Sequence, residues 1–263
     1  MNIHNIWIVV FIFILFLFFY KQIKRYMLNR IRMMEGFEEN DIPLKVFQTW
    51  KTLDMPPKMK KNRDRMIELN PEFEYILMDD EQCRNFIRDN FDSKTLNAYD
   101  SLVPGAYKAD LWRYCILYKY GGIYFDIKLR PADDFKLTEL TKKEHFVQDR
   151  QEYFKPGSLG LYNACMITKK GNECMKKCIE KIIENVETNY YGYNDLYPTG
   201  PGLLGIVYSS TYKDNSYVDL LYIGGEKITQ DGKLVIHSYP EYREEAPYSG
   251  KYGQLWRAKN IYK

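Results

Sequence analysis

Residues 107–128, with the sequence YKADLWRYCILYKYGGIYFDIK, contain a helix signal, two glycines and a strand signal in direct succession. The pattern in residues 107–120 predicts a helix, and Gly121 and Gly122 end it, as glycines commonly end helices. Residues 123–127 alternate their side chains between two faces, which predicts a strand. A helix followed at once by a strand is typical of an α/β fold.

Further strand and helix signals alternate along the chain. The sequence predicts strands at residues 44–48, 75–78, 163–168, 218–223 and 234–236, and helices at residues 58–69, 80–90 and 172–188. Asp79 and Asp80 are interpreted as the N-terminal cap of the second helix. Strands that alternate with helices predict a mixed, mostly parallel, Rossmann-like sheet with flanking helices.

The most apolar part of the chain lies near its start. Residues 6–20 form an unbroken apolar run, and with residues 3–5 they give about 18 helical residues, just enough to cross a bilayer. No basic start and no small-residue cleavage site marks a cleavable signal peptide. We expect a transmembrane anchor and a basic juxtamembrane segment in residues 1–35 and one globular domain in residues 36–263; a buried core helix is the alternative for the run.

Basic residues follow this run: Lys21, Lys24, Arg25, Arg30 and Arg32. Only the terminal amine and His4 precede it, so the positive-inside rule predicts a single-pass membrane protein with a cytosolic domain. A luminal domain is the alternative, because large domains can be translocated regardless of charge.

The net charge of +3 comes from 38 Lys and Arg and 35 Asp and Glu. The five juxtamembrane bases exceed this surplus, so the rest of the chain is slightly acidic. Such a body argues against nucleic acid as a partner. The juxtamembrane bases instead suit the anionic headgroups of a lipid bilayer.

The five cysteines show no CxxC spacing and predict neither a disulfide framework nor a zinc site. Cys178 falls on the apolar stripe of the expected helix 172–188, so it is predicted to be a core residue.

Polar side chains follow the expected strands, at the ends where α/β sheets bind ligands. Gln48 and Thr49 precede the aromatic plane of Trp50, a combination suited to stacking a nucleobase and bonding its edge. Asp126 and Lys128 share a strand face with Tyr124. Asp110 and Arg113 are three residues apart and share a helix face. Carboxylates accept hydrogen bonds from sugar hydroxyls and cations meet phosphate, so the pattern predicts a phosphorylated, polyhydroxylated ligand.

The segment 107–128 closely resembles the sugar-donor segment of the Asp-x-Asp glycosyltransferases related to fungal initiating mannosyltransferases, capsular-polysaccharide transferases and clostridial glucosylating toxins. IPLKVFQTWK, NPEFEYILMDD, YNACMIT and YPTGPG resemble further segments of that family, and the likeness covers most of residues 42–205. The resemblance implies a GT-A-like fold. It also implies transfer of a hexose from a nucleotide sugar, either UDP- or GDP-linked, to a glycan or protein acceptor with retention.

The resemblance implies roles for individual residues. Phe47, Gln48, Thr49 and Trp50 would border the base. Asp110 and Arg113 would hold the hydroxyls of the donor sugar, and Asp126 would contact both ribose and sugar. Tyr124 and Asn163 would lie on the donor side.

Lys128 departs from the family pattern, which has a second, metal-binding acid at this position. Either Lys128 itself neutralises the diphosphate, or a weaker site for Mn or Mg survives on Asp126 and another ligand. His237 is a candidate for that ligand, with an ordinary strand-end histidine as the alternative.

Two segments remain for the acceptor or phosphate side. GPGLLG at residues 200–205 matches GxGxxG, but no apolar strand precedes it, so a dinucleotide fingerprint is excluded. A turn that leads into a helix suits Gly200, Pro201 and Gly202 better. Trp256 is interpreted either as a lid over the diphosphate or as core packing.

Two other functions compete with the transferase. Lys128 favours a catalytically inactive relative that binds nucleotide or glycan at the membrane. The second competitor is an unrelated structural membrane protein, which would leave the clustered polar residues unexplained.

Overall fold

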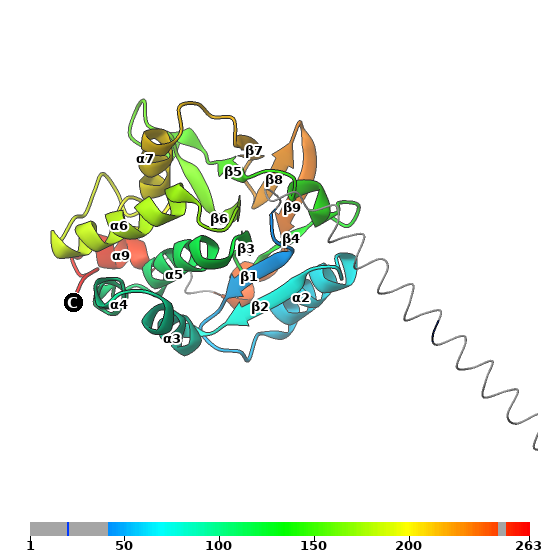
Figure 1. Ribbon diagram of the computed structural model, residues 1–263, viewed down its shortest axis with the longest axis horizontal. Helices are drawn as coiled ribbons and strands as arrows, with labels where there is room; N and C mark the ends of the chain where they lie inside the picture. The colour runs from blue at the N-terminus through cyan, green and yellow to red at the C-terminus, as the bar shows by residue number, and fades with distance from the viewer. Residues whose placement is uncertain (1–19, 21–41, 247–250) are drawn as a thin grey trace, which may run out of the picture. The chain divides into compact units, whose positions relative to one another are not determined.

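Nine strands form one sheet in the part of the chain that the computed structural model describes: residue 20, residues 42–246 and residues 251–263 (Figure 1). The strands are β1 (Lys45–Thr49), β2 (Glu74–Met78), β3 (Gly122–Phe125), β4 (Leu129–Pro131), β5 (His145–Gln148), β6 (Leu161–Thr168), β7 (Val218–Tyr222), β8 (Lys227–Gln230) and β9 (Lys233–Ser238). Their order across the sheet is β2-β1-β3-β6-β5-β7-β8-β9-β4.

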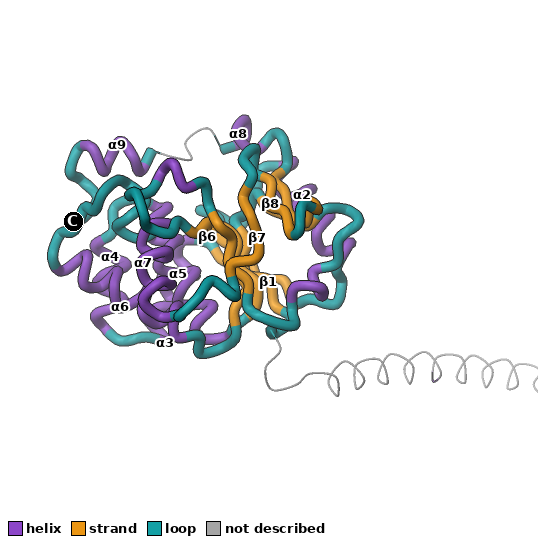
Figure 2. The backbone as a smooth tube through the Cα atoms, turned by 90° about the horizontal axis from the view of Figure 1, so that it is seen from above, coloured by secondary structure: helices purple, strands orange, loops and turns teal. Residues whose placement is uncertain are grey.

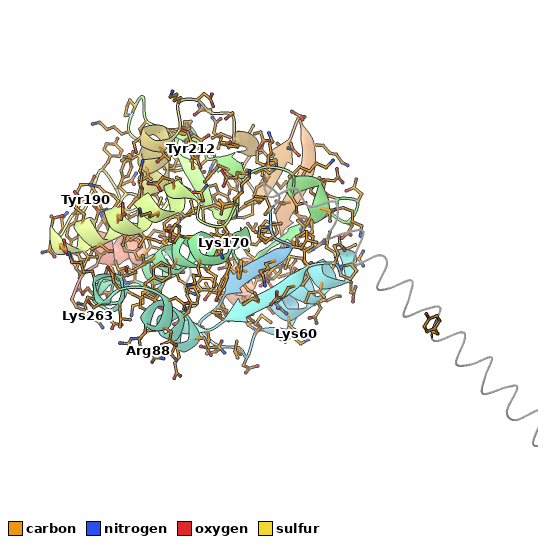
Figure 3. The ribbon with its side chains drawn as sticks, viewed as in Figure 1. Lys60, Arg88, Lys170, Tyr190, Tyr212 and Lys263 are labelled. Carbon is orange, nitrogen blue, oxygen red and sulfur yellow. The ribbon has the colours of Figure 1, made fainter. Side chains whose placement is uncertain are left out.

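Helices cover both faces of this sheet. They are α2 (Pro57–Leu69), α3 (Asp80–Asn90), α4 (Ser93–Ser101), α5 (Gly105–Tyr120), α6 (Glu173–Glu187), α7 (Pro201–Thr211), α8 (Tyr242–Glu245) and α9 (Tyr252–Arg257). Figure 2 shows α3 to α7 together on one side of the strands and α2 on the other. Charged side chains such as Lys60 and Arg88 lie on the outer surface, as Figure 3 shows.

The helix and strand predictions are confirmed within a few residues. Asp79 caps α3 with a reciprocal capping box, in which its carboxylate accepts from the Gln82 backbone N–H and the Gln82 side chain accepts from the Asp79 N–H. Gly121 ends α5 at a φ of 65°, where an added Cβ would lie 2.4 Å from the Lys170 nitrogen. The helix predicted after Gly200 is α7.

The prediction of a mostly parallel sheet is wrong. Among the described strands, β1 with β2, β1 with β3 and β5 with β7 are parallel, whereas the five other neighbouring pairs are antiparallel. Short connections explain the difference, because β7, β8 and β9 follow one another as hairpins without intervening helices. The sequence pattern also missed β4, β5 and β8, whose three or four residues are too few for a clear alternation.

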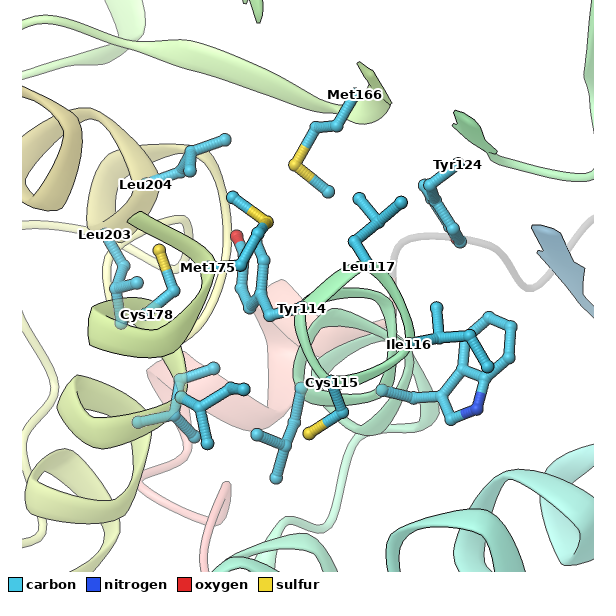
Figure 4. Packing of buried hydrophobic residues seen from close by; sticks show 14 of the residues in the cluster. Tyr114, Cys115, Ile116, Leu117, Tyr124, Met166, Met175, Cys178, Leu203 and Leu204 are labelled. Carbon is cyan, nitrogen blue, oxygen red and sulfur yellow. The ribbon is translucent and has the colours of Figure 1, made fainter. Parts of the chain in front are cut away.

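Side chains alternate between two apolar cores. Tyr124 on β3 packs with α5 on one face of the sheet, and its neighbours Ile123 and Phe125 face the other. Figure 4 shows the first core, where Tyr114 and Leu117 of α5 approach Met166 and Met175. Cys178 is fully buried in this core, as predicted, and all five cysteines are buried free thiols.

The turn after β3 carries the chain across the sheet. Strand β3 is third in the strand order, and β4, only a few residues later in the chain, pairs with β9 at the far end. The sheet therefore curls, and the residues of this turn, Asp126 to Lys128, lie where its two halves approach.

Residues 42–263 form one compact unit, and its last residues bond to the end of α4 and to the segment that follows it. The Val103 N–H donates to the Ile261 carbonyl at 2.9 Å, and the Lys263 N–H to Ser101 at 2.8 Å. The expected membrane anchor lies, apart from Tyr20, outside the described residues. Among the described residues, no helix combines the length and apolar character needed to span a membrane.

Candidate functional site

Arg113 joins two carboxylates at the C-terminal end of β3. Its Nη2 lies 3.3 Å from Oδ1 of Asp110 on the same helix and 3.3 Å from Oδ1 of Asp126. Its Nη1 donates to the Asn163 carbonyl at 2.8 Å, and the guanidinium lies 4.4 Å from the Tyr124 ring centroid. Burial disfavours the positive charge of Arg113, and the negative charges of Asp110 and Asp126 offset this cost.

Asp110 is buried with a full set of partners. Asn163 donates to its Oδ1 at 2.8 Å, and Thr199 donates to its Oδ2 at 2.7 Å. Burial raises the pKa of Asp110, although Arg113 and these two hydrogen bonds oppose the increase. Asp110 is therefore held rigidly and organises its neighbours.

Asp126 is more accessible than Asp110. Its side chain is 28% exposed, and the Tyr124 hydroxyl donates to its Oδ1 at 2.9 Å. This bond and the Arg113 contact fix one carboxylate oxygen. The carboxylate of Asp126 therefore has a fixed orientation in which it can bind a ligand.

Lys128 lies on the other side of Asp126. Its Nζ is 3.9 Å from Oδ2 of Asp126 and 3.0 Å from Oε2 of Glu226, in the β7–β8 turn. Burial lowers the pKa of Lys128, but the nearby carboxylates of Asp126 and Glu226 raise it overall. Asp126 and Lys128 converge as predicted, although β3 ends at Phe125 and a turn rather than strand alternation aligns them.

The four residues predicted to border the base divide into two pairs. Phe47 is fully buried against Tyr120, and the Thr49 hydroxyl donates to the Met78 carbonyl at 2.8 Å, so both serve the packing of β1. Gln48 is 1% exposed, and within the described residues its amide oxygen and nitrogen have no hydrogen-bond partner. The Trp50 indole N–H is also buried and has no hydrogen-bond partner in the part of the chain that the structure describes.

Gln48 and Trp50 lie at the carboxyl end of β1, which is the end of the sheet where Asp126 also lies. Phe47 pairs with Tyr124 in parallel register, so Trp50 and Asp126 both lie just beyond that pair. Unsatisfied buried polar groups are rare in proteins, because each costs about 1–3 kcal/mol. Gln48 and Trp50 thus retain hydrogen-bonding capacity at the carboxyl end of β1, where Trp50 packs with Ile127 and Tyr239.

The segment around Gly200 reaches the same cluster. A Cβ on Gly200 would lie 3.3 Å from Oδ2 of Asp110, which Thr199 already bonds. Gly200 is the N-cap of α7 and Pro201 its first residue. Gly202 packs on the Tyr197 ring.

Trp256 and His237 have other surroundings. The Trp256 indole donates to the Tyr191 carbonyl at 2.7 Å and packs at the edge of the first core, an arrangement that suits packing. His237 pairs with Arg130 on β4 and with Lys227 on β8. Burial, and then the charge of Arg130, lower the pKa of His237, and neighbouring cations disfavour a bound metal.

The sequence reasoning did not identify Glu226, Tyr162 or Tyr252. The Tyr162 hydroxyl donates to Oε2 of Glu226 at 2.6 Å. Burial, and then the carboxylates of Asp195 and Asp110, raise the pKa of Tyr252 to about 12. Tyr162 directly precedes Asn163 in the YNACMIT segment, whereas Glu226 lies in a turn without a local motif.

The donor set around Asp126 does not fit a divalent metal. Among the described residues, no group of three or more His, Cys, Asp or Glu side chains is placed to hold one. The ammonium of Lys128 instead lies beside Asp126 and Glu226, the two carboxylates that would serve as ligands. A divalent ion there would meet a positive charge rather than a third oxygen.

A family comparison agrees with this geometry. Residues 56–147 match the family model described as the glycosyltransferase sugar-binding region containing a DXD motif. This part of the chain is similar to the sugar-binding region of DXD glycosyltransferases. This region includes α5, β3 and the Asp126 turn, so the resemblance inferred from the sequence is confirmed.

Several fungal proteins are similar to this sugar-binding region and its surroundings. Inositol phosphoceramide mannosyltransferase 3 of Schizosaccharomyces pombe is 32% identical over 173 residues, which are 65% of this chain and 46% of the relative. Mannosyl phosphorylinositol ceramide synthase SUR1 of Saccharomyces cerevisiae is 36% identical over 199 residues, 75% of this chain and 49% of the relative. The chain thus spans about half the length of these relatives.

A solved structure is similar to the fold. The structure titled PaToxG Glycosyltransferase superposes with a TM-score of 0.51 at 18% identity and covers 65% of this chain and 71% of that one. The described domain therefore has a glycosyltransferase-like mixed α/β fold with a curled sheet.

Proposed function

We propose that this chain is a glycosyltransferase that transfers a hexose from a nucleotide-sugar donor, UDP- or GDP-linked, to an acceptor hydroxyl with retention. The observation that carries the proposal is the convergence of Asp110, Arg113, Asp126 and Asn163 in one hydrogen-bonded cluster at the end of β3. The match to the sugar-binding region and the mannosyltransferase name of the Schizosaccharomyces pombe relative support the same activity.

The donor-side residues suit the parts of a nucleotide sugar. The Gln48 amide and the Trp50 indole, which have no hydrogen-bond partner among the described residues, would bond or stack a base beyond β1. Asp126 presents an oriented carboxylate to ribose and sugar hydroxyls. Asp110 and Arg113 form a rigid support, and Arg113 contributes positive charge behind Asp126.

The reaction needs electrostatic help more than a protein nucleophile. The bond from the anomeric carbon to the diphosphate oxygen breaks, and the acceptor oxygen bonds to that carbon on the same face. The acceptor proton passes to the departing diphosphate, so the products are a glycoside and a nucleoside diphosphate. The cations of Lys128 and Arg113 stabilise the negative charge that develops on the diphosphate.

The acceptor is proposed to be a glycan, a protein or a glycolipid. Two fungal relatives have inositol phosphoceramide or mannosyl phosphorylinositol ceramide in their names, which adds a lipid to the candidate acceptors. A membrane anchor in residues 1–35 and a catalytic domain in residues 36–263 accord with such a substrate. The positive charges after the apolar run favour a cytosolic domain.

The test is donor hydrolysis and transfer by the full chain, screened over UDP- and GDP-sugars with EDTA and with Mn²⁺ in parallel. Turnover of one donor, lost in Asp126→Asn, would support the enzyme and identify its sugar. Saturable nucleotide binding without turnover would instead favour the inactive binding module, and no binding of any nucleotide would overturn both functions.

A further inference from the structure

Lys128 is held by a residue that lies almost 100 positions away in the sequence. Its Nζ is 3.0 Å from Oε2 of Glu226 and 3.9 Å from Oδ2 of Asp126, and its side chain is 14% exposed. An ammonium has three N–H donors, and Glu226 accepts from only one of them. The remaining donors can therefore bond to a ligand beside Asp126. Two carboxylates thus flank one mostly buried cation.

The Glu226 side chain has its own support. The Tyr162 hydroxyl donates to Oε2 at 2.6 Å, and the Tyr162 ring stacks on Tyr222 with centroids 4.5 Å apart. The Lys128 Nζ lies 5.7 Å from the centroid of the same Tyr162 ring. The ion pair therefore rests on an aromatic platform.

The backbone also fixes both partners. Glu226 has a φ of 58°, a left-handed conformation that residues with side chains rarely adopt, directly after Gly225. Its carbonyl accepts from Ser238 at 2.9 Å, and the Lys128 carbonyl accepts from the adjacent Tyr239 at 3.3 Å. Lys128 and Glu226 are thus both attached to the end of β9, which fixes the distance between them.

The charge balance agrees with replacement of a metal. An ammonium in place of a carboxylate changes the local charge by as much as a bound divalent ion would. The ion pair network around Asp126 can therefore receive an anionic diphosphate without a metal. A metal would have to displace the ammonium from both carboxylates, at a cost in desolvation and repulsion.

We propose that the Lys128 ammonium, positioned by Glu226 beside Asp126, takes the place of a divalent metal ion, so that the chain binds a nucleoside diphosphate without metal. This inference rests on the proposed function and specifies how its donor site meets the diphosphate. Glu226 is a positioning residue, because it acts through Lys128.

The first experiment measures UDP and GDP binding to the full chain by calorimetry, with EDTA and with Mn²⁺. We expect the affinity for the nucleotide that binds to differ by less than about twofold between the two conditions. Binding that requires Mn²⁺ would overturn this inference and leave the glycosyltransferase function standing. Absence of binding by either nucleotide, in both conditions, would overturn the two together.

The second experiment measures Mn²⁺ binding by electron paramagnetic resonance and needs no nucleotide. Lys128→Asp would place a third carboxylate between Asp126 and Glu226, so it should bind Mn²⁺ at least about tenfold more tightly than the wild type. Adding Glu226→Gln to this variant should remove most of the gain. The exposed Lys213→Asp makes the same charge change elsewhere and should leave Mn²⁺ binding at the wild-type level.

Two results of this second experiment would contradict the inference. One is Mn²⁺ binding by the wild type that exceeds the Lys213→Asp control and disappears in Asp126→Asn. The other is a folded Lys128→Asp variant, verified by circular dichroism, that gains no Mn²⁺ affinity. If that variant does not fold, the nucleotide measurement on the wild type still decides the question.

Discussion

The side-chain amide of Asn163 donates a hydrogen bond of 2.8 Å to Oδ1 of Asp110, although the two residues are 53 positions apart. The same nitrogen donates to the Tyr114 hydroxyl at 3.1 Å, and the Asn163 carbonyl accepts from Arg113. One residue of β6 therefore orders both charged residues of α5.

Asn163→Ala should destabilise the protein and weaken donor binding. The backbone bond to Arg113 remains, but Asp110 and Tyr114 each lose a buried partner, which costs about 1–3 kcal/mol. Denaturant unfolding measures the loss. Asn215→Ala, at an exposed position, should stay within about 0.5 kcal/mol of the wild type, and equal stabilities of the two variants would contradict the role of Asn163.

Asp126→Asn should affect turnover far more than stability. The substitution keeps the shape but removes the charge that faces Arg113 and Lys128, and losses of about 10²-fold or more are typical of such electrostatic groups. The unfolding free energy should change less, because Arg113 keeps Asp110 and Lys128 keeps Glu226 as an ion-pair partner. Asp133→Asn, at an exposed carboxylate 60% accessible, is the control; comparable activities of the two variants would exclude Asp126 from the donor site.

Asp149 should make stability depend on pH in the opposite sense to an ordinary ion-paired carboxylate. Burial raises its pKa from 3.8 to about 6, so between these values the folded protein binds more protons than the unfolded chain. The free energy of unfolding therefore falls as the pH rises through this window, by up to about 3 kcal/mol.

Asp149→Asn removes this dependence and tests it directly. The variant should be more stable than the wild type at pH 7.5, and the difference should vanish near pH 4, as thermal unfolding across the pH range would measure. Glu187→Gln, at an exposed position, should follow the wild-type curve. A constant difference between Asp149→Asn and wild type at all pH values would show that the carboxylate does not titrate in this way.

Gly205→Ala should destabilise the protein even though alanine is the better helix former. The added Cβ would lie 1.8 Å from the Leu159 carbonyl oxygen, so α7 would have to move, at a cost of about 1–3 kcal/mol. Gly105→Ala is the matched control, because nothing lies within 4 Å of its Cβ in the first turn of α5. It should be neutral or stabilising by at most about 1 kcal/mol; a stable Gly205→Ala would mean that the α7 contact is loose.

The sequence predicted the parts of the site that lie within one local unit. Asp110, Arg113 and Asp126 belong to a single helix, turn and strand, so helical and strand periodicity suffice to group them. Glu226 could not be predicted in this way. Its contact with Lys128 depends on how far the sheet curls, and no local pattern encodes that curvature.

The same limit explains the error in strand direction. Alternating strands and helices indicated parallel crossovers, yet β6 enters the sheet antiparallel to β3 after a stretch without a long helix. The packing of β1 separated Phe47 and Thr49 from Gln48 and Trp50, although the four are consecutive. The two pairs occupy alternate positions along β1, so strand periodicity places them on opposite faces of the sheet.

The pairing of β4 with β9 has a consequence for how the protein is made. On the ribosome β4 is complete soon after residue 131, but its partner is complete only after residue 238, so at about 5–20 residues per second β4 waits several seconds for it. The helices beside α5 rest on contacts closer in sequence and can form during that delay. A nascent chain that ends before β9 would hold Asp110 and Arg113 in a nearly complete helical layer, but it would lack Ser238 and Tyr239, whose N–H groups hold the backbone of Glu226 and Lys128. Translation of β9 and Tyr239 therefore completes the donor site.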